Sequence, residues 1–178
     1  ALAHGVVGAS TTAAVVIGAV PIPFADALLL TPIEISLVNG LSRIYGISKN
    51  EESKQFFNSI VEVGTVSVAA KTLLSALKAI PGINLGASVL NAIIAGSIVG
   101  ALGEGSIFAF EQVFLGKKSV SDIIWVQKVI EEKLSPKLKE TIKAIVEQIS
   151  ANPNKNDIGG VITEAIKALF NKENIQKV

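Results

Sequence analysis

The chain has 178 residues, which is enough for one helical domain with a core but short for two independent domains. It is 49% hydrophobic and 17% charged, more apolar than an ordinary soluble domain, so part of it is buried on all sides or lies in lipid. A net charge of +1 gives no electrostatic case for nucleic acid, and the absence of cysteine excludes disulfides, thiolate metal sites and a cysteine nucleophile.

The first predicted helix covers residues 2–19 and ends because Pro21 cannot continue a helix. A second helix begins at Pro23, whose fixed φ suits a first turn, and runs to Tyr45, with Gly46 as a left-handed cap. The two prolines therefore form a tight corner between these helices.

A third predicted helix begins at Ser48-Lys49-Asn50-Glu51, a pattern that fits a capping box. It runs to Ile80, where Pro81-Gly82 turns the chain. A fourth helix is predicted over residues 85–115 and is expected to be loosened by the glycines of residues 103–105.

Gly116 closes the fourth helix, and three amphipathic helices are predicted after it, near residues 120–134, 136–151 and 158–171. Ser135-Pro136 is expected to start the middle one. Their predicted rows are Ile123, Gln127 flanked by Val126, Ile130 and Leu134; Leu138, Ile142, Ile145 and Ile149; and Ile158, Ile162, Ala165, Ile166 and Leu169.

Charge divides the chain into two regions. Residues 1–116 carry 5 basic and 7 acidic residues, whereas residues 117–178 carry 11 and 8. We expect an apolar helical body over 1–116 and a charged amphipathic extension over 117–178 that packs on it. No stretch combines strict alternation with hairpin turns, so the predicted fold is an all-α bundle with glycine-rich central helices.

Residues 79–103 form a run of 25 residues without a formal charge, nominally long enough to cross a bilayer. Leucine, isoleucine and valine favour insertion there, but asparagine, serine and glycine oppose it or contribute little. Ala92, Gly96 and Gly100 recur every four residues and let another helix approach closely, as in membrane bundles and in crowded soluble cores. Both a buried central helix and a lipid-facing helix stay open.

Few residues of this chain are candidates for metal binding or acid–base catalysis. His4 is the only histidine and has no neighbour at metal-ligand spacing, so we interpret it as incidental and expect no metal site. Asp26 and Glu34 are about 12 Å apart on one helix, too far to share a proton. Asp26 fits the first turn of the second helix, and Glu34 either faces solvent or pairs with a basic side chain. We predict no catalytic residue and no cofactor.

Three short patterns resemble functional motifs without their context. Residues 154–157, Asn-Lys-Asn-Asp, match the guanine-reading pattern of GTPases, but no strand or phosphate loop precedes them, so we interpret them as a capping loop. Residues 100–105 share only their glycine content with a phosphate loop. Lys117 and Lys118 could hold an anionic membrane surface, although interleaved acidic residues favour a solvated face.

Several spaced motifs coincide with a known family. They are AVPIPFAD at 19–26, LTPIE at 30–34, RIYGI at 43–47, KAIPGI at 78–83 and ALG at 101–103. Over residues 5–115 the chain resembles the domain of unknown function 697 family, the YcjF-like helical domain. The motif positions that we single out are Pro21, Pro23, Asp26, Pro32, Tyr45, Gly46, Pro81 and Gly82.

This resemblance implies a helical, membrane-associated domain that in many bacterial proteins follows a small GTPase domain of the Era type. It implies no catalytic residues. The family often has glutamine at the position of Glu34 and methionine at that of Leu37, which puts a shared role for position 34 in doubt.

We therefore expect a non-enzymatic accessory domain of a small-GTPase-type protein, in the cytoplasm or at the inner membrane. It would couple a GTPase domain, fused or separate, to membrane lipid or a protein partner, and could form homo-oligomers through the small-residue stripe. The alternative is a soluble bundle that inserts glycine-rich hairpins into lipid, as pore-forming bundles do. A third hypothesis is an enzyme or carrier with an apolar cavity and Asp26 or Glu34 as its polar point.

Overall fold

The computed structural model describes residues 1–18, 27–66 and 87–151. Its helices in these ranges are α1 (Leu2–Gly18), α2 (Ala27–Ile44), α3 (Glu51–Val66), α5 (Ala87–Phe114) and α6 (Ile123–Ala151). The described ranges contain no strand, and the predicted all-α class is confirmed.

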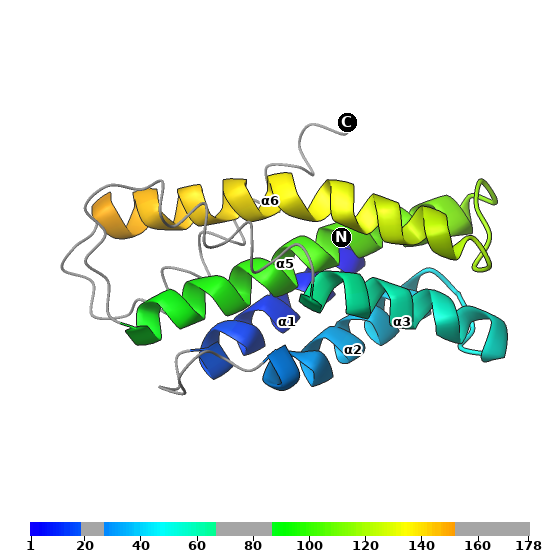
Figure 1. The fold of residues 1–178 in the computed structure, drawn as a ribbon, viewed down its shortest axis with the longest axis horizontal. Helices are drawn as coiled ribbons and strands as arrows, with labels where there is room; N and C mark the ends of the chain where they lie inside the picture. The colour runs from blue at the N-terminus through cyan, green and yellow to red at the C-terminus, as the bar shows by residue number, and fades with distance from the viewer. Residues whose placement is uncertain (19–26, 67–86, 152–178) are drawn as a thin grey trace.

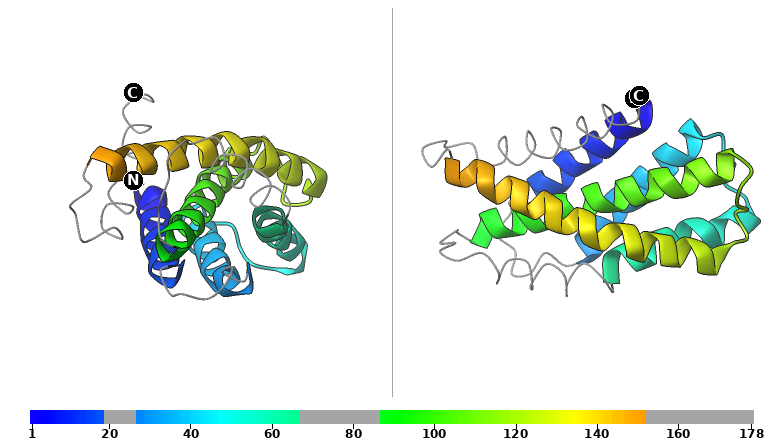
Figure 2. Two further views of the ribbon diagram at one scale, coloured as in Figure 1. Left: turned by 60° about the vertical axis from the view of Figure 1, so that its left-hand side comes forward. Right: turned by 90° about the horizontal axis from the view of Figure 1, so that it is seen from above.

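The central element is α5, which contacts each of the other four helices (Figure 1). The helix α6 covers one side of α5, while α1 and α2 lie on the opposite side and α3 lies beside α2 (Figure 2). The chain direction of α1 is opposite to that of α5 (Figure 1). A helix that is apolar all round must be covered all round, and this arrangement provides that cover for α5.

The core follows α5 along its length. Each fully buried aliphatic or aromatic side chain contributes about 1.5–3 kcal/mol relative to exposure. The largest fully buried side chains in the described residues are Leu37, Leu41, Phe56, Ile60, Ile93, Leu102, Phe110, Ile130, Ile142 and Ile145.

Both α2 and α5 end in a glycine with a left-handed backbone, since φ is 67° at Gly46 and at Gly116. The left-handed cap at Gly46 and the end of the helix at Gly116 were predicted. After α2, the Gly46 N–H donates to the Arg43 carbonyl at 3.2 Å and the Ile47 N–H donates to the Ser42 carbonyl at 2.9 Å. This pair of bonds is the Schellman motif, and Gly116 ends α5 with the same pattern. A residue with a Cβ would be strained at either glycine.

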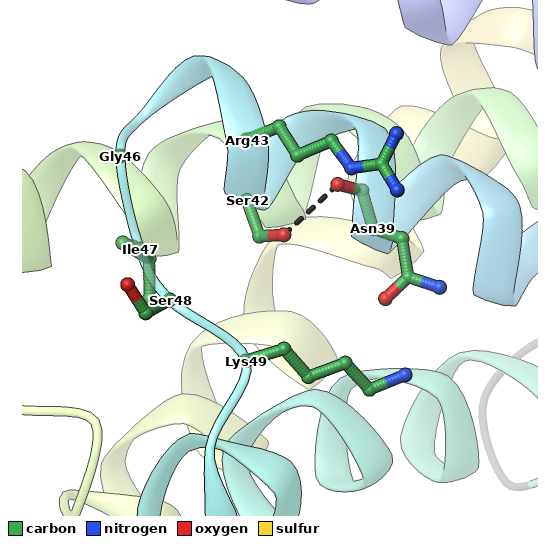
Figure 3. Close-up of a pocket in the computed structure, with 7 residues that line it drawn as sticks. All are labelled: Asn39, Ser42, Arg43, Gly46, Ile47, Ser48 and Lys49. Atoms are coloured by element: carbon green, nitrogen blue, oxygen red, sulfur yellow. Dashed lines mark hydrogen bonds between the residues drawn. The ribbon is translucent and has the colours of Figure 1, made fainter.

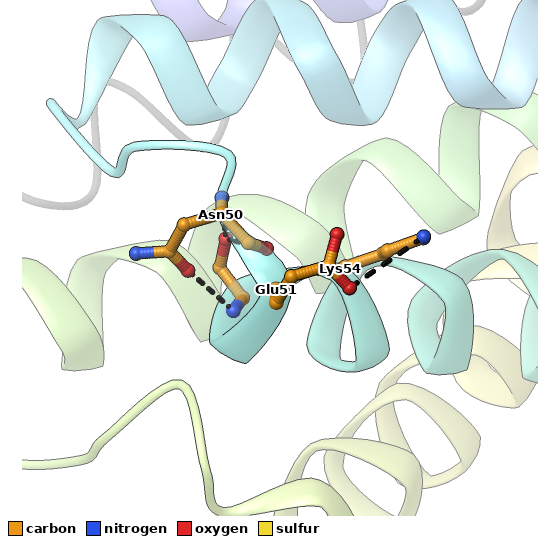
Figure 4. A network of polar contacts seen from close by, with 4 residues as sticks. Asn50, Glu51 and Lys54 are labelled. Atoms are coloured by element: carbon orange, nitrogen blue, oxygen red, sulfur yellow. Dashed lines mark hydrogen bonds and ion pairs between the residues drawn. The ribbon is translucent and has the colours of Figure 1, made fainter.

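The N-cap of α3 differs from the prediction. Asn50 and Ser53 form the capping box, with the Ser53 N–H donating to Asn50 Oδ1 at 2.8 Å and the Asn50 N–H donating to Ser53 Oγ at 2.9 Å (Figure 4). Ser48 instead accepts a bond from Ser53 Oγ on its carbonyl at 2.7 Å. Glu51 is exposed and pairs with Lys54 at 3.7 Å. The prediction was wrong because asparagine caps a helix as well as serine does, and it lies two residues later.

Pro136 does not start a helix, contrary to the prediction, but lies inside α6. An internal proline costs about 3 kcal/mol, because it removes one backbone hydrogen bond and crowds the preceding turn. Both halves of α6 bury apolar side chains, Ile130 before the proline and Ile142 after it. Their tertiary packing outweighs the local cost, so one helix replaces the two that were predicted.

The predicted loosening at residues 103–105 is also absent, since α5 is continuous through these glycines. Four predictions concern residues outside the described ranges. They are the Pro21/Pro23 corner with Asp26, the end of the third helix with Pro81-Gly82, the helix over 158–171 and the loop at 154–157.

Candidate functional site

The seam between α1 and α5 is closely packed at a glycine. A Cβ at Gly103 would lie 2.6 Å from both Cγ atoms of Val7 and 3.1 Å from its Cβ. Such distances are too short for a Cβ contact, so only glycine admits Val7 at this point. The glycine thus permits close helix packing and does not break the helix, which explains why α5 stays continuous there.

A histidine–carboxylate pair lies near this contact. His4 Nδ1 of α1 is 2.9 Å from Glu104 Oε1 of α5, and their side chains are only 20% and 10% exposed. The interpretation of His4 as incidental is corrected by this contact. The sequence carries no signal for it, because the two residues are 100 positions apart and belong to no motif. In the described ranges, no three potential ligands among His, Cys, Asp and Glu gather as a metal site.

The buried polar side chains of the described residues include Thr11 of α1, Glu34 of α2 and Ser97 of α5. Thr11 follows His4 by seven residues and Ser97 precedes Glu104 by seven, which places both about 10 Å along antiparallel helices from that pair. Glu34 is 0% exposed, so the first of the two alternatives given for it, that it faces solvent, is wrong. Neither the Thr11 hydroxyl nor the Ser97 hydroxyl has a hydrogen-bond partner among the described residues, a costly situation inside a core.

The small residues Ala92, Gly96 and Gly100 are all buried in the interior of the bundle. Within the described residues, Ala92–Phe114 is the one helical segment long and apolar enough to cross a membrane, and 83% of its 18-residue apolar window is buried. A membrane-length helix is therefore enclosed by the other helices in this conformation.

An open hollow of about 420 Å³ lies where α2 turns into α3 (Figure 3). Arg43 and Lys49 extend along its two sides, and Ser42 Oγ donates to the Asn39 carbonyl at 2.9 Å. A groove of about 530 Å³ between α1 and α2 shares Asn39 and Arg43 with it. The guanidinium and ammonium groups make the hollow suited to an anion, not to acid–base chemistry.

Aromatic rings join the ends of α2, α3 and α5. The Tyr45 ring stacks on Phe110 and meets Phe114 edge-on, with both centroid distances 6.2 Å. Phe110 also contacts Phe56 at 6.1 Å and Phe57 at 5.7 Å. This cluster holds the α2–α3 turn against the last turns of α5.

The Tyr45 hydroxyl donates to Glu111 Oε1 at 3.3 Å. Burial of the phenol, followed by the charge and the hydrogen bond of Glu111, raises the pKa of Tyr45 from 10.0 to about 12. The folded state therefore favours the neutral phenol, and the resulting stability is present below pH 10 and lost as the pH rises through about 12.

We expect an alkaline absorbance titration to give a tyrosinate midpoint near 12 in the folded chain and near 10 in urea. Tyr45 is the only tyrosine, so the signal has one source. Glu111→Gln should move the folded midpoint part of the way down. A folded midpoint at the unfolded value would contradict the buried environment.

The turn between α5 and α6 exposes apolar side chains beside two lysines. Phe114 is 65% exposed, Leu115 57% and Ile124 83%. Lys117 and Lys118 lie between them in the sequence and are also exposed. We call these five residues the α5–α6 tip.

Of the predicted motif positions in the described ranges, Pro32 is exposed inside α2, whereas Tyr45 and Gly46 form the end of that helix. The structure thus brings Tyr45 and Gly46 close to the α5–α6 tip, through the contact of Tyr45 with Phe114. Sequence reasoning singled out Lys117 and Lys118 but missed their exposed apolar neighbours, whose exposure depends on where α5 and α6 end.

Residues 3–151 match the family model described as Domain of unknown function (DUF697). The match continues beyond residue 115, where the resemblance seen in the sequence ended, and includes α6. No curated protein and no solved structure matches the chain.

Proposed function

The chain belongs to the DUF697 family, and from this premise we propose that it is a non-enzymatic accessory domain that couples a small GTPase of the Era type to a membrane. The observation that carries the proposal is the enclosure of α5. An apolar helix that is packed on all sides by its neighbours makes a stable scaffold. Contacts with a membrane or with a GTPase domain are then made by the surface of the bundle.

The arrangement of polar groups supports a binding role. The two hollows are open, and Arg43 and Lys49 are the charged residues that line the hollow at the α2–α3 turn. Glu34, the buried acid considered for catalysis, lines neither of these hollows. A scaffold with cationic and apolar surface features fits attachment to lipid better than turnover of a substrate.

A second candidate is a bundle that opens and inserts α5 into lipid. Two observations favour it: Ala92–Phe114 has the length and composition of a membrane span, and unpartnered hydroxyls of Thr11 and Ser97 lie in the interior. Unsatisfied polar groups lower the cost of separating the helices, because water would hydrate them on opening.

A disulfide staple separates the two candidates. Val7→Cys with Gly103→Cys introduces the only two thiols of the chain, and a Cβ at 103 would lie 3.1 Å from that at 7, so the helices need to part slightly to reach the ~3.5–4.5 Å of disulfides. Oxidation should join α1 to α5 and raise stability by about 4 kcal/mol, since the closed loop is long. We expect the oxidised and reduced forms to float equally well with liposomes.

Equal flotation, together with release by high salt, supports surface attachment of a closed bundle. Loss of flotation on oxidation, or retention through an alkaline carbonate wash only when reduced, would favour the inserting bundle. If no form floats, membrane coupling is overturned. An Era-type GTPase domain added to the assay should reach the lipid layer only when this chain is present.

A further inference from the structure

The α5–α6 tip combines exposed apolar and cationic side chains, and the turn lies at one end of the bundle (Figure 1). Neither of the two hollows is lined by any of its five residues. Phe114, Leu115 and Ile124 are among the most exposed large apolar side chains of the described ranges. Packing within the bundle gives no reason for their exposure.

The backbone of the tip is held in place. Gly116 carries the left-handed turn, and the Lys117 N–H donates to the Gln112 carbonyl at 2.9 Å. Asp122 Oδ2 accepts the Ser119 N–H at 2.9 Å, which fixes the approach to α6. The lysines are therefore presented beside the apolar side chains at little cost in backbone entropy on binding.

Charge at the tip favours an anionic partner. Lys118 Nζ lies 5.2 Å from the ring centroid of Trp125, which orients the ammonium next to an aromatic ring. The acid of this turn, Asp122, is half-buried, and its carboxylate accepts the Ser119 N–H, so the two lysines outnumber the one acid of the turn. Arg43 and Lys49 add two cations at the same end of the bundle.

We infer that the α5–α6 tip is the site where the chain contacts an anionic membrane, with Phe114, Leu115 and Ile124 entering the interface and the lysines meeting lipid phosphates. The inference rests on the proposed function and locates its lipid contact. A membrane is favoured over an acidic protein because protruding apolar side chains and adjacent lysines match the layered chemistry of a lipid interface without a groove.

The first test compares binding of the full chain to vesicles of phosphatidylcholine alone and to vesicles with one third phosphatidylglycerol. Lys117→Glu/Lys118→Glu should weaken binding to the anionic vesicles by about tenfold or more, because each lysine near an anionic surface contributes to the attraction and each glutamate is repelled. The difference between wild type and variant should shrink at high salt, which screens these charges. Lys128→Glu/Lys143→Glu makes the same charge change on exposed positions of α6 and should leave most of the binding.

The second test addresses the apolar part. Phe114→Ser/Leu115→Ser should also weaken vesicle binding several-fold, whereas Leu2→Ser/Val16→Ser, on exposed positions of α1, should not. Trp125 is the only tryptophan, so its fluorescence reports on the tip alone. Brominated phosphatidylglycerol should quench it in the wild type and less in either tip variant.

The outcomes separate the inference from the proposed function. If the wild type binds anionic vesicles and the tip variants bind as tightly, with Trp125 unquenched, the tip inference is overturned and membrane association stands. If the wild type binds no vesicle, both are overturned. Binding that falls equally in tip and control variants would also overturn the inference, because it would show dependence on net charge alone. Thermal unfolding of each variant confirms that it is folded.

Discussion

Phe110→Ala is expected to lower the free energy of unfolding by about 3–5 kcal/mol, the largest effect of any single change considered for this chain. Phe110 is 0% exposed and contacts the rings of Tyr45, Phe56 and Phe57. Its loss removes a buried aromatic side chain and leaves a cavity at the junction of three helices. Because the free energy of unfolding of a domain is only about 5–15 kcal/mol, this substitution would remove a large part of it.

Phe114→Ala is the matched control, because it is the same substitution one turn later on the same helix. Phe114 is 65% exposed and has an edge contact with Tyr45, so we expect a loss within about 1 kcal/mol. Urea unfolding followed by circular dichroism measures both variants. Equal losses in the two variants would show that the aromatic cluster is not the core element described above.

Gly103→Leu is expected to destabilise the bundle by about 3 kcal/mol, through overpacking. Its Cβ alone would lie 2.6 Å from both Val7 methyl carbons, and the backbone of α1 or α5 would have to move. The gain in helix propensity over glycine, about 1 kcal/mol, works in the opposite direction and is outweighed. Urea unfolding gives the difference.

Two further variants test whether overpacking against Val7 causes the loss of stability in Gly103→Leu. Gly5→Ala places a Cβ on α1 with no atom within 4 Å, and it should be neutral or slightly stabilising. Val7→Ala combined with Gly103→Ala should cost less than the sum of the two single changes, because each relieves the clash of the other. Strict additivity would contradict direct contact between these side chains.

The helical content of this chain could be predicted from local signals. Apolar spacing identified the helices, and the glycines at 46 and 116 marked the ends of α2 and α5 correctly, because a left-handed cap is a local requirement of the backbone. Prediction failed where two local signals competed and where tertiary packing overrode a local signal. Asn50 replaced Ser48 as the N-cap of α3, and Pro136 was kept inside α6 by packing on both of its sides.

The candidate sites were less accessible to prediction than the helices. Lysines at 117 and 118 were visible as a charged pair, but their partners in the α5–α6 tip are defined by exposure, which depends on the whole bundle. The same holds for the hollow beside Arg43 and Lys49, which exists because the α2–α3 turn folds back onto the end of α2.

The sequence by itself determined the helical class, the helix ends at the two glycines and an uncharged run of membrane length at 79–103, since each depends on residues within a few turns of one another. Only the tertiary structure decided that most of the apolar segment Ala92–Phe114 is enclosed, that Glu34 is buried and that His4 meets Glu104. Burial and pairing between helices depend on crossing geometry and register over as many as 100 positions, and the local pattern of one helix carries no information about the helix that covers it.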